Sequence, residues 1–323
     1  MRAVVLDAPG PPEALRIRDL PVPDVPGGRV RIRIAAFGLN RSELHTRLGL
    51  AEGVVFPRVL GIECTGVVDS APGTSLVPGQ KVVAMMGGMG RVIDGGYAEY
   101  TVVPRECVIP VETDLPWEVL GALPEMLQTS YGSLTVGLDA QPGQTLLIRG
   151  GTSSIGMATA SLAKDIGMEV LATTRRPDRV DALRANGVDH VIVDSGEIAR
   201  TVRDIVPDGV DAALELVGTP TLPDTLRCTR VHGVVCFTGM LSNEWLVKDF
   251  YPIGYIPTGV RLTGYGGESG NLPVGVLQRY LDLIADGKLS VPVHRVYRLD
   301  EIQQAHRDME DNAATGKLVV RVE

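Results

Sequence analysis

The sequence lacks the features that mark several protein classes. It has only four cysteines, and no two of them form a C-x-x-C pair, which argues against a disulfide framework and against a zinc ribbon. No apolar run reaches the roughly 18 residues of a membrane-spanning helix, and residues 1–10 hold no apolar stretch of signal-peptide length. The formal net charge is −8, and no basic stripe is visible, so nucleic acid is not an expected partner. We therefore expect a cytoplasmic protein that binds neither membranes nor nucleic acids.

The chain is long enough for more than one domain. Its 323 residues suggest two domains at about 150 residues each. Residues 1–118 contain short apolar segments between turn signals, and in residues 29–35 the side chains of Val30, Ile32 and Ile34 alternate with arginines. This period of two is typical of a strand with one buried face. Many short strands of this kind indicate a barrel or a sandwich.

After residue 118, apolar strand segments alternate with helical segments. The alternation predicts βαβ units, and hence an α/β fold with a doubly wound parallel sheet. The expected strands are 145–149, 169–174, 190–194, 211–217 and 234–238, and the expected helices between them include 157–166 and 179–186. Two further helices at 274–286 and 300–309 and a last strand at 317–322 should follow.

The turn from Gly150 to Gly156 follows an apolar strand and begins a helix. Small residues there let backbone N–H groups approach a dinucleotide pyrophosphate, and the helix N-terminus adds a favourable partial charge. Ser153 replaces the middle glycine of the G-x-G-x-x-G fingerprint, so the motif is incomplete, but its context has the expected spacing. The predicted binding residues are Gly151, Thr152, Ser153, Ser154, Ile155 and Gly156.

The end of the next strand predicts which cofactor binds. NAD-binding chains carry an acidic residue about 20 residues beyond the glycines, whereas this chain has Thr174, Arg175 and Arg176 there. Guanidinium groups bind phosphate bidentately, so we expect NADPH; alternatively, both arginines only face solvent at a helix start. Ligands bind at the carboxyl ends of parallel strands. The residues expected to flank the nicotinamide are therefore Val217, Gly218, Thr238 and Gly239.

Several stretches carry a family resemblance. They are GLNRSELHTRLG (38–49), PRVLGIECTGVV (57–68), PGQKVV (78–83), GGYAEY (95–100), LQTSYGSL (127–134) and the GGTSSIG turn. In this order they resemble the medium-chain dehydrogenase/reductase family, and within it the zinc-free quinone oxidoreductases and zeta-crystallin-like reductases. The resemblance implies a GroES-like β-barrel catalytic domain at 1–118, a Rossmann NADPH-binding domain at 119–265, and a segment at 266–323 that returns to the first domain. It also implies a homodimer, for which residues 255–265 could supply a pairing edge strand.

The resemblance also bears on metal binding. Zinc-dependent members hold a catalytic zinc with a cysteine, a histidine and usually a second cysteine, and the matching positions here are Asn40, Ile62 and approximately Glu125. Catalytic zinc needs three protein ligands with N, S or O donors, so we expect no metal. Glu63 and Glu125 leave open a carboxylate-rich site. The four-cysteine loop of a structural zinc is also absent.

Without a metal, hydrogen-bond donors must stabilise the oxyanion that develops during hydride transfer. The expected catalytic residues are Asn40, Ser42, His45 and Thr129. Ser42 and His45 match by position the proton relay of zinc alcohol dehydrogenases. Because quinone oxidoreductases often have a tyrosine in place of His45, this residue is either a proton donor or structural. Ser42 could instead cap the helix that follows, and Thr129 could instead bond to its own backbone.

These residues lead to one functional hypothesis and two alternatives. We expect an NADPH-dependent, zinc-independent oxidoreductase that transfers hydride to a small-molecule quinone or α,β-unsaturated carbonyl compound. Ser42 and His45 keep open a zinc-independent alcohol dehydrogenase or ketone reductase. An NADPH-binding protein with a structural role and negligible turnover is the other alternative, because cofactor binding and chemistry use different residues.

Overall fold

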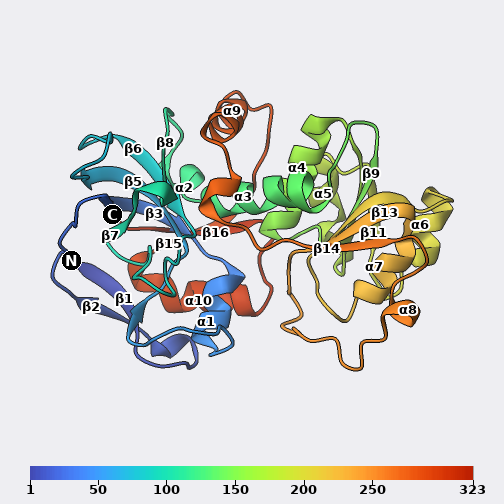
Figure 1. Ribbon diagram of the computed structural model, residues 1–323, viewed down its shortest axis with the longest axis horizontal. Coiled ribbons are helices and arrows are strands. Elements are labelled where there is room, and N and C mark those ends of the chain that lie inside the picture. The colour runs from blue at the N-terminus through green and yellow to red at the C-terminus, as the bar shows by residue number, and fades with distance from the viewer. Residues whose placement is uncertain (323) are drawn as a thin grey trace. The chain divides into compact units, whose positions relative to one another are not determined.

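The computed structural model describes residues 1–322, and the chain in it forms two compact units (Figure 1). The first unit comprises residues 1–128, 268–288 and 292–323, and the second comprises residues 129–267 and 289–291. The sequence predicts domain boundaries near residues 118 and 265, whereas in the structure the chain passes from one unit to the other after residues 128 and 267. The helix α3 (Pro124–Gly132) contains the first of these changes.

The first unit is built on a seven-stranded sheet of order β15-β16-β3-β5-β6-β8, with β7 pairing to β3. As the alternating pattern predicts, Val30, Ile32 and Ile34 of β3 are buried, while Arg33 is exposed. The last strand returns from the end of the chain and pairs antiparallel with β3. The sheet strands are β3 (Arg29–Gly38), β5 (Glu63–Ser70), β6 (Lys81–Met85), β7 (Tyr100–Pro104), β8 (Val108–Pro110), β15 (Val293–Arg298) and β16 (Lys317–Arg321).

A smaller three-stranded sheet and four helices complete the first unit. Side chains of the small sheet, of β3 and of the last helix share one apolar core, which includes Leu6, Ile32 and Ile302. The small sheet has β1 (Arg2–Leu6) between β2 (Leu15–Asp19) and β4 (Arg58–Val59), and the helices are α1 (Arg41–Arg47), α2 (Trp117–Leu120), α9 (Val274–Ala285) and α10 (Ile302–Glu310).

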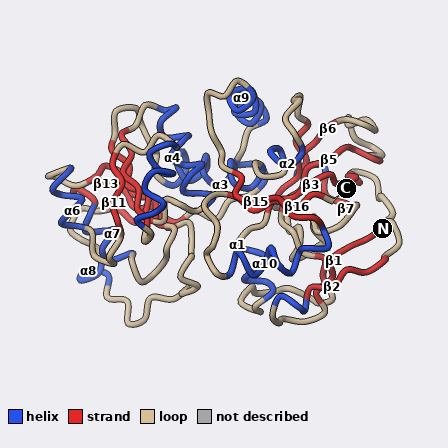
Figure 2. The backbone as a smooth tube through the Cα atoms, turned by 180° about the vertical axis from the view of Figure 1, so that it is seen from behind, coloured by secondary structure: helices blue, strands red, loops and turns tan. Residues whose placement is uncertain are grey.

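The second unit is a six-stranded sheet of order β11-β10-β9-β12-β13-β14 in which every pair is parallel. Chain order reverses between β9 and β12, so their carboxyl ends form the topological switch point at which such sheets bind ligands. Figure 2 shows α4 on one side of this sheet and α6 and α7 on the other. The strands are β9 (Thr145–Arg149), β10 (Glu169–Thr174), β11 (His190–Val193), β12 (Val210–Glu215), β13 (Thr229–Phe237) and β14 (Arg261–Gly264), and the helices are α4 (Ser154–Ile166), α5 (Val180–Ala185), α6 (Ala199–Ile205), α7 (Leu222–Cys228) and α8 (Pro252–Tyr255). The expected doubly wound α/β fold is confirmed.

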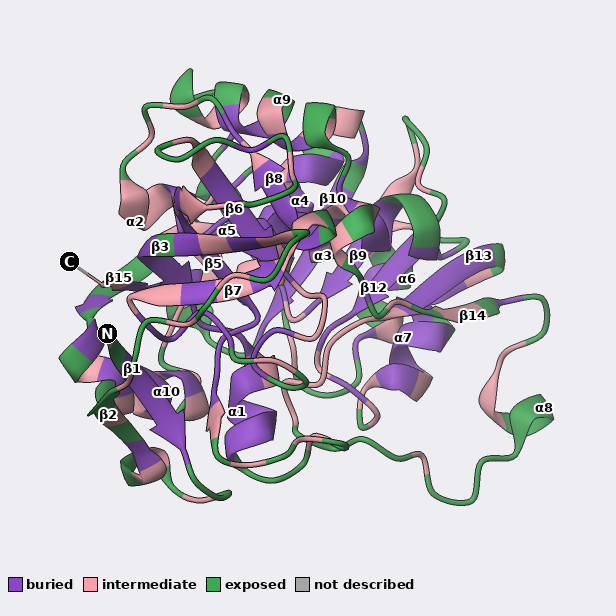
Figure 3. Cartoon of the chain, turned by 60° about the vertical axis from the view of Figure 1, so that its left-hand side comes forward, coloured by how far each residue is buried: buried purple, intermediate pink, exposed green. Residues whose placement is uncertain are grey.

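Two helix starts differ from the sequence prediction. Helix α4 begins at Ser154 rather than at residue 157, because Ser153 caps it directly after the turn. Helix α1 begins at Arg41 with Asn40 as its N-cap, so Ser42 lies inside the helix and the suggestion that it caps this helix is wrong. Figure 3 shows the strands β5, β6, β9 and β12 largely buried, and α8 with the segment before it exposed. Among the described residues, no helix combines the length and apolar character needed to cross a bilayer.

Candidate active site

The first unit buries a cluster of charged side chains next to Asn40. Lys317, the first residue of β16, has a fully buried ammonium group, and its Nζ lies 2.8 Å from Oε1 of Glu63, which is also fully buried. A second carboxylate, that of Glu125, approaches the same ammonium at 3.3 Å. Gly38 makes room for this pair, because a Cβ there would lie 2.4 Å from Glu63 Oε1 and 2.4 Å from Lys317 Cε.

All polar atoms of the Asn40 side chain are engaged by this cluster. Its Nδ2 donates to Glu63 Oε1 at 2.9 Å and to Glu43 Oε1 at 3.4 Å, and its Oδ1 accepts a hydrogen bond from Lys317 Nζ. An amide group has two N–H donors, and both point at carboxylates. In this arrangement Asn40 holds its neighbours in place, and it has no free donor for a substrate oxyanion.

Burial controls the charges in the cluster. It raises the pKa of Glu43 to about 7, although the backbone N–H of Ile62 partly opposes the shift. It also raises the pKa of Glu63, against the attraction of Lys317. Burial alone would lower the pKa of Lys317, but Glu63 and Glu125 outweigh it and raise that pKa. Lys317 is therefore an ammonium ion at neutral pH, and it balances part of the negative charge around it.

The same cluster includes two of the three positions that the resemblance assigns to zinc ligands. Asn40 and Glu125 both face the Lys317 ammonium, and the third position is the alkyl side chain of Ile62, which is buried. Glu63 and Glu125, the pair that left open a carboxylate-rich site, thus share an internal cation. Among residues 1–322, no group of three or more His, Cys, Asp or Glu side chains could hold a metal ion.

Ser42 and His45 both lie on α1. The Ser42 hydroxyl accepts a hydrogen bond of 2.7 Å from Arg91 Nη2, and the His45 side chain is buried. Thr129, the remaining predicted catalytic residue, belongs to the second unit. Asn40, Ser42 and His45 thus lie on one short segment; the contacts of Asn40 leave it no donor for a substrate, and the catalytic roles of Ser42, His45 and Thr129 stay predictions.

A buried contact between helices fixes α1. The guanidinium group of Arg47, at the end of α1, donates to His306 Nδ1 at 3.3 Å and to Glu310 at 2.6 Å on α10. The other ring nitrogen of His306 lies 3.2 Å from the Tyr97 hydroxyl. Burial, and then the charge of Arg47, lower the pKa of His306 to about 3. His306 is therefore neutral at neutral pH, and it links α1, Tyr97 and α10 in a buried contact.

In the second unit, the predicted phosphate turn joins β9 to α4. The Ser153 hydroxyl accepts a hydrogen bond from the Gly156 N–H at 3.1 Å and donates to the Gly150 carbonyl at 2.8 Å. The side chain that replaces the middle glycine is thus the N-cap of α4. Gly150 has a φ of 92°, which favours glycine, and a Cβ at Gly151 would lie 2.8 Å from the Cβ of Ala172. Ser154 and Ile155 begin the first turn of α4, where backbone N–H groups have no acceptor within the helix.

The end of β10 lies beside this turn. The Thr173 hydroxyl accepts a hydrogen bond from the Gly150 N–H at 3.0 Å, and Thr174 bonds to the backbone of Arg176. Arg175 and Arg176 are exposed, and Arg176 pairs with Asp178 at 2.6 Å. Burial, followed by the positive charges of Arg176 and Arg175, lowers the pKa of Arg179. The two arginines predicted to bind the 2′-phosphate are therefore both exposed directly after β10, and the charge of Arg179 adds to theirs.

The carboxyl ends of β12 and β13 also meet. The carboxylate of Glu215 accepts hydrogen bonds from the N–H groups of Val217 at 2.7 Å and Gly218 at 2.9 Å. The Glu215 carbonyl accepts from the N–H groups of Thr238 at 3.0 Å and Gly239 at 3.1 Å. All four residues that were predicted to flank the nicotinamide are therefore held around one glutamate.

Sequence reasoning missed several buried charged residues, and three of them stand at the ends of strands. Arg149 and Glu215 are fully buried at the carboxyl ends of β9 and β12, and Lys317 is buried at the start of β16. Each stands in or next to an apolar strand segment, where an unpaired charge would be very costly. A charged residue at the end of an apolar strand therefore indicates a buried ion pair, but it does not show which residue is the partner.

Comparisons with known proteins find related domains in this chain. Residues 26–113 match the alcohol dehydrogenase GroES-like domain, and residues 186–320 match the zinc-binding dehydrogenase domain. A curated relative, the probable quinone oxidoreductase of Schizosaccharomyces pombe, is 27% identical over 96% of this chain and 94% of its own length.

Solved structures show the same two-unit fold. A structure of an NAD-dependent alcohol dehydrogenase has a TM-score of 0.89 and 26% identity, with 100% of both chains covered. A mycobacterial protein solved in complex with NADPH has a TM-score of 0.87 and 24% identity, again with 100% of both chains covered. The expected GroES-like and Rossmann units are confirmed, and the chain belongs to the medium-chain dehydrogenase/reductase family of oxidoreductases.

Proposed function

We propose that this protein is an NADPH-dependent, zinc-independent oxidoreductase that transfers hydride to a quinone or to an α,β-unsaturated carbonyl compound. The observation that carries the proposal is the phosphate turn at the topological switch point, with Arg175, Arg176 and Arg179 beside it. The S. pombe relative named as a probable quinone oxidoreductase and the mycobacterial complex with NADPH support the substrate class and the cofactor.

The residues of the second unit fit a nicotinamide dinucleotide. The first-turn N–H groups of Ser154 and Ile155 would hold the pyrophosphate, since a helix N-terminus attracts anions. Arg175 and Arg176 would hold the 2′-phosphate, and the segments after β12 and β13 would flank the nicotinamide. When bound, the cofactor supplies the hydride; the protein orients it and keeps water away.

The preference for NADPH should depend more on Arg175 than on Arg176. Asp178 holds the Arg176 guanidinium through two hydrogen bonds, at 3.1 and 2.6 Å. Within residues 1–322 no ion pair uses Arg175, so its guanidinium is available to a phosphate. A hydrogen bond to a charged group contributes about 1.5–3 kcal/mol, which is about 10- to 150-fold in affinity.

Zinc independence rests on the buried cluster of the first unit. Asn40 and Glu125 face the Lys317 ammonium, and Ile62 offers no donor atom. A zinc ion at this place would have to displace Lys317 from three acceptors. We propose that Ser42 or His45, rather than Asn40, donates the hydrogen bond that stabilises the developing oxyanion.

The first test follows NADPH absorbance with a panel of quinones, enones and simple ketones, after treatment with EDTA and with NADH in parallel. We expect quinones or enones to oxidise NADPH at a rate that EDTA leaves unchanged. Activity that is lost with EDTA would contradict zinc independence. Activity confined to ketones would favour the alcohol dehydrogenase alternative, and NADPH binding without any turnover would favour the structural one.

The cofactor preference is tested with Arg175→Ala, Arg176→Ala and the control Arg16→Ala. Arg16 is an exposed arginine of β2 in the first unit, so the control makes the same change of net charge. We expect Arg175→Ala to raise the KM for NADPH about tenfold or more and to leave the KM for NADH unchanged. Equal effects on both cofactors would contradict binding of the 2′-phosphate by Arg175.

A further inference from the structure

Arg149 ends β9 and directly precedes the phosphate turn, and its guanidinium group is fully buried. Its Nε and Nη2 bond to the two carboxylate oxygens of Asp194 at 2.6 and 2.9 Å, and its Nη1 bonds to Asp224 at 2.7 Å. Nη2 also donates to the Gly196 carbonyl at 2.8 Å. One arginine thus binds both the segment after β11 and the first turn of α7.

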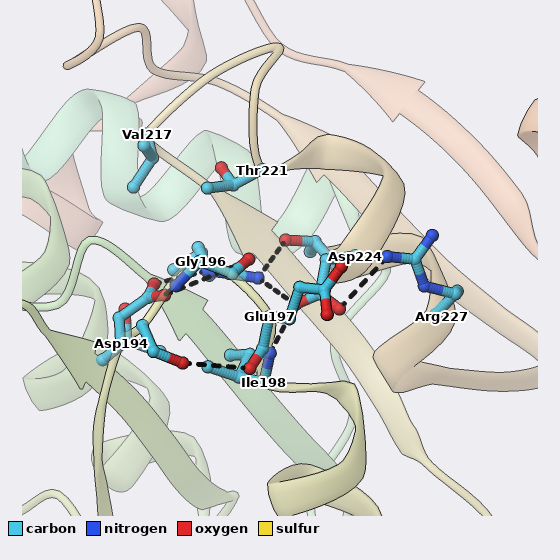
Figure 4. Close-up of polar contacts among 12 residues, drawn as sticks. Asp194, Gly196, Glu197, Ile198, Val217, Thr221, Asp224 and Arg227 are labelled. Carbon is cyan, nitrogen blue, oxygen red and sulfur yellow. Dashed lines mark hydrogen bonds and ion pairs between the residues drawn. The ribbon is translucent and has the colours of Figure 1, made fainter.

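The two carboxylates fix the backbone of the segment after β11, residues 194–198. Asp194 Oδ1 accepts a hydrogen bond of 2.8 Å from the Gly196 N–H, and Asp224 Oδ2 accepts one of 2.8 Å from the Ile198 N–H. Figure 4 shows these contacts, with Asp194, Gly196, Ile198 and Asp224 gathered around the network. The conformation of residues 194–198 therefore depends on the charge that Arg149 supplies.

This segment adjoins the predicted 2′-phosphate site. The Asp194 N–H donates to the Thr174 carbonyl at 2.8 Å, and Thr174 directly precedes Arg175. The segment after β12 is held separately, because Glu215 bonds to Val217, Gly218, Thr221 and Thr225. Arg149 contacts this second network through Thr225 at 3.4 Å. Burial raises the pKa of the Glu215 carboxyl group, and the charge of Arg149 opposes this rise.

We propose that Arg149 is a positioning residue for cofactor binding: it holds residues 194–198 in the conformation that receives the adenosine half of the dinucleotide. This inference rests on the proposed function. A buried ion pair contributes little net stability compared with apolar side chains of the same size, so stability alone does not account for an arginine with two buried aspartates here. Their position at the carboxyl edge of the sheet, where ligands bind, assigns them to the cofactor site.

An ion pair at the opposite edge of the same sheet provides a control. Asp211, near the start of β12, pairs with Arg230 at 2.7 Å and accepts hydrogen bonds from Thr145 at the start of β9. Breaking this pair disturbs the same unit away from the carboxyl ends of the strands. Arg230→Met should therefore lower stability without changing cofactor affinity.

The experiment compares Arg149→Met, Arg149→Lys and Asp194→Asn with Arg230→Met in the full-length protein. It measures the melting temperature, kcat, the KM for NADPH and the inhibition constant for adenosine 2′,5′-bisphosphate, which probes the adenosine half alone. We expect Arg149→Met to raise both constants about tenfold, as when the binding-competent conformation falls to about one tenth of the molecules. The value of kcat at saturating NADPH should stay within about twofold of wild type, because the Glu215 network remains.

The outcomes separate this inference from the proposed function. Arg149→Lys should lie between wild type and Arg149→Met, because an ammonium keeps the charge but not the bidentate geometry. If Arg149→Met does not fold, Asp194→Asn decides. This change removes the charge that pairs with Arg149, but an asparagine can still accept the hydrogen bond from Gly196. A lowered melting temperature with an unchanged KM and inhibition constant in the folded variants overturns the positioning role. Wild-type protein that binds neither NADPH nor the bisphosphate overturns the proposed function itself.

Discussion

Replacing Lys317 with methionine tests the central claim about the buried cluster. Methionine fills a similar volume but removes the ammonium group that contacts both Glu63 and Glu125. Both Lys317 and Glu63 are fully buried, and removing one partner of a buried ion pair costs about 3–5 kcal/mol because the other charge stays uncompensated. We therefore expect Lys317→Met to lower the free energy of unfolding of the first unit by about this amount at neutral pH.

The loss should depend on pH. Burial already raises the pKa of Glu63 in the folded protein, and removing the ammonium raises it further. A carboxyl group whose folded pKa lies above its unfolded pKa binds more protons in the folded state, so stability falls as the pH rises between the two values. The loss in free energy of unfolding caused by Lys317→Met should thus be smallest near pH 5 and largest near pH 8.

The assay is denaturant unfolding of the full-length protein, followed by the fluorescence of Trp117 in a Trp245→Phe background. Trp117 lies on α2 of the first unit, so it reports on the unit that contains the cluster. The double variant Lys317→Met/Glu63→Gln should be more stable than the sum of the single effects predicts, by about 2 kcal/mol, because it removes both charges. A loss below about 1 kcal/mol, or additive effects at every pH, would refute the cluster as described.

Three further predictions concern local features. Ser153→Ala should destabilise the second unit by about 1 kcal/mol through loss of the N-cap of α4, whereas Ser153→Gly should cost only a few tenths; equal melting temperatures for the two variants would contradict the capping role. Burial raises the pKa of Glu43 to about 7, so the free energy of unfolding of the wild type should fall as the pH rises from the pKa of Glu43 in the unfolded chain to above 7. Glu43→Gln should lose this dependence on pH in the same unfolding assay. An unchanged dependence would show that Glu43 does not titrate in this range. Sedimentation should give a homodimer, with β14 as the exposed edge that pairs across it, and a monomeric mass would contradict this.

Much of the second unit could be predicted because its signals are local. The expected strands 145–149 and 169–174 have the bounds of β9 and β10, since short apolar segments between glycine-containing turns define parallel strands. The glycine-rich turn between β9 and α4 was also recognisable, and its binding of phosphate stays a prediction. The start of α4 was misplaced because the whole segment from Gly150 to Gly156 was assigned to the turn, whereas Ser153 already caps the helix.

The charged networks could not be predicted, because their members are far apart in the chain. Asn40 and Lys317 are separated by 277 positions, and Arg149 and Asp224 by 75. Asn40 was expected to donate to a substrate because its sequence neighbours do not reveal that β16 returns beside β3 and brings Lys317 to its oxygen. A buried charge in a strand shows that a partner must exist, but only the pairing of strands identifies it.

The sequence by itself determined the family, the doubly wound sheet, the phosphate turn and the arginines after β10. The turn and the arginines follow from residues within one turn or one strand, and the family and the sheet follow from the order of such local segments along the chain. The tertiary structure decided which buried charges neutralise one another, and hence that the amide of Asn40 is fully engaged and that Arg149 holds residues 194–198. Electrostatic pairing depends on distance in space, and folding brings together side chains that lie tens to hundreds of residues apart.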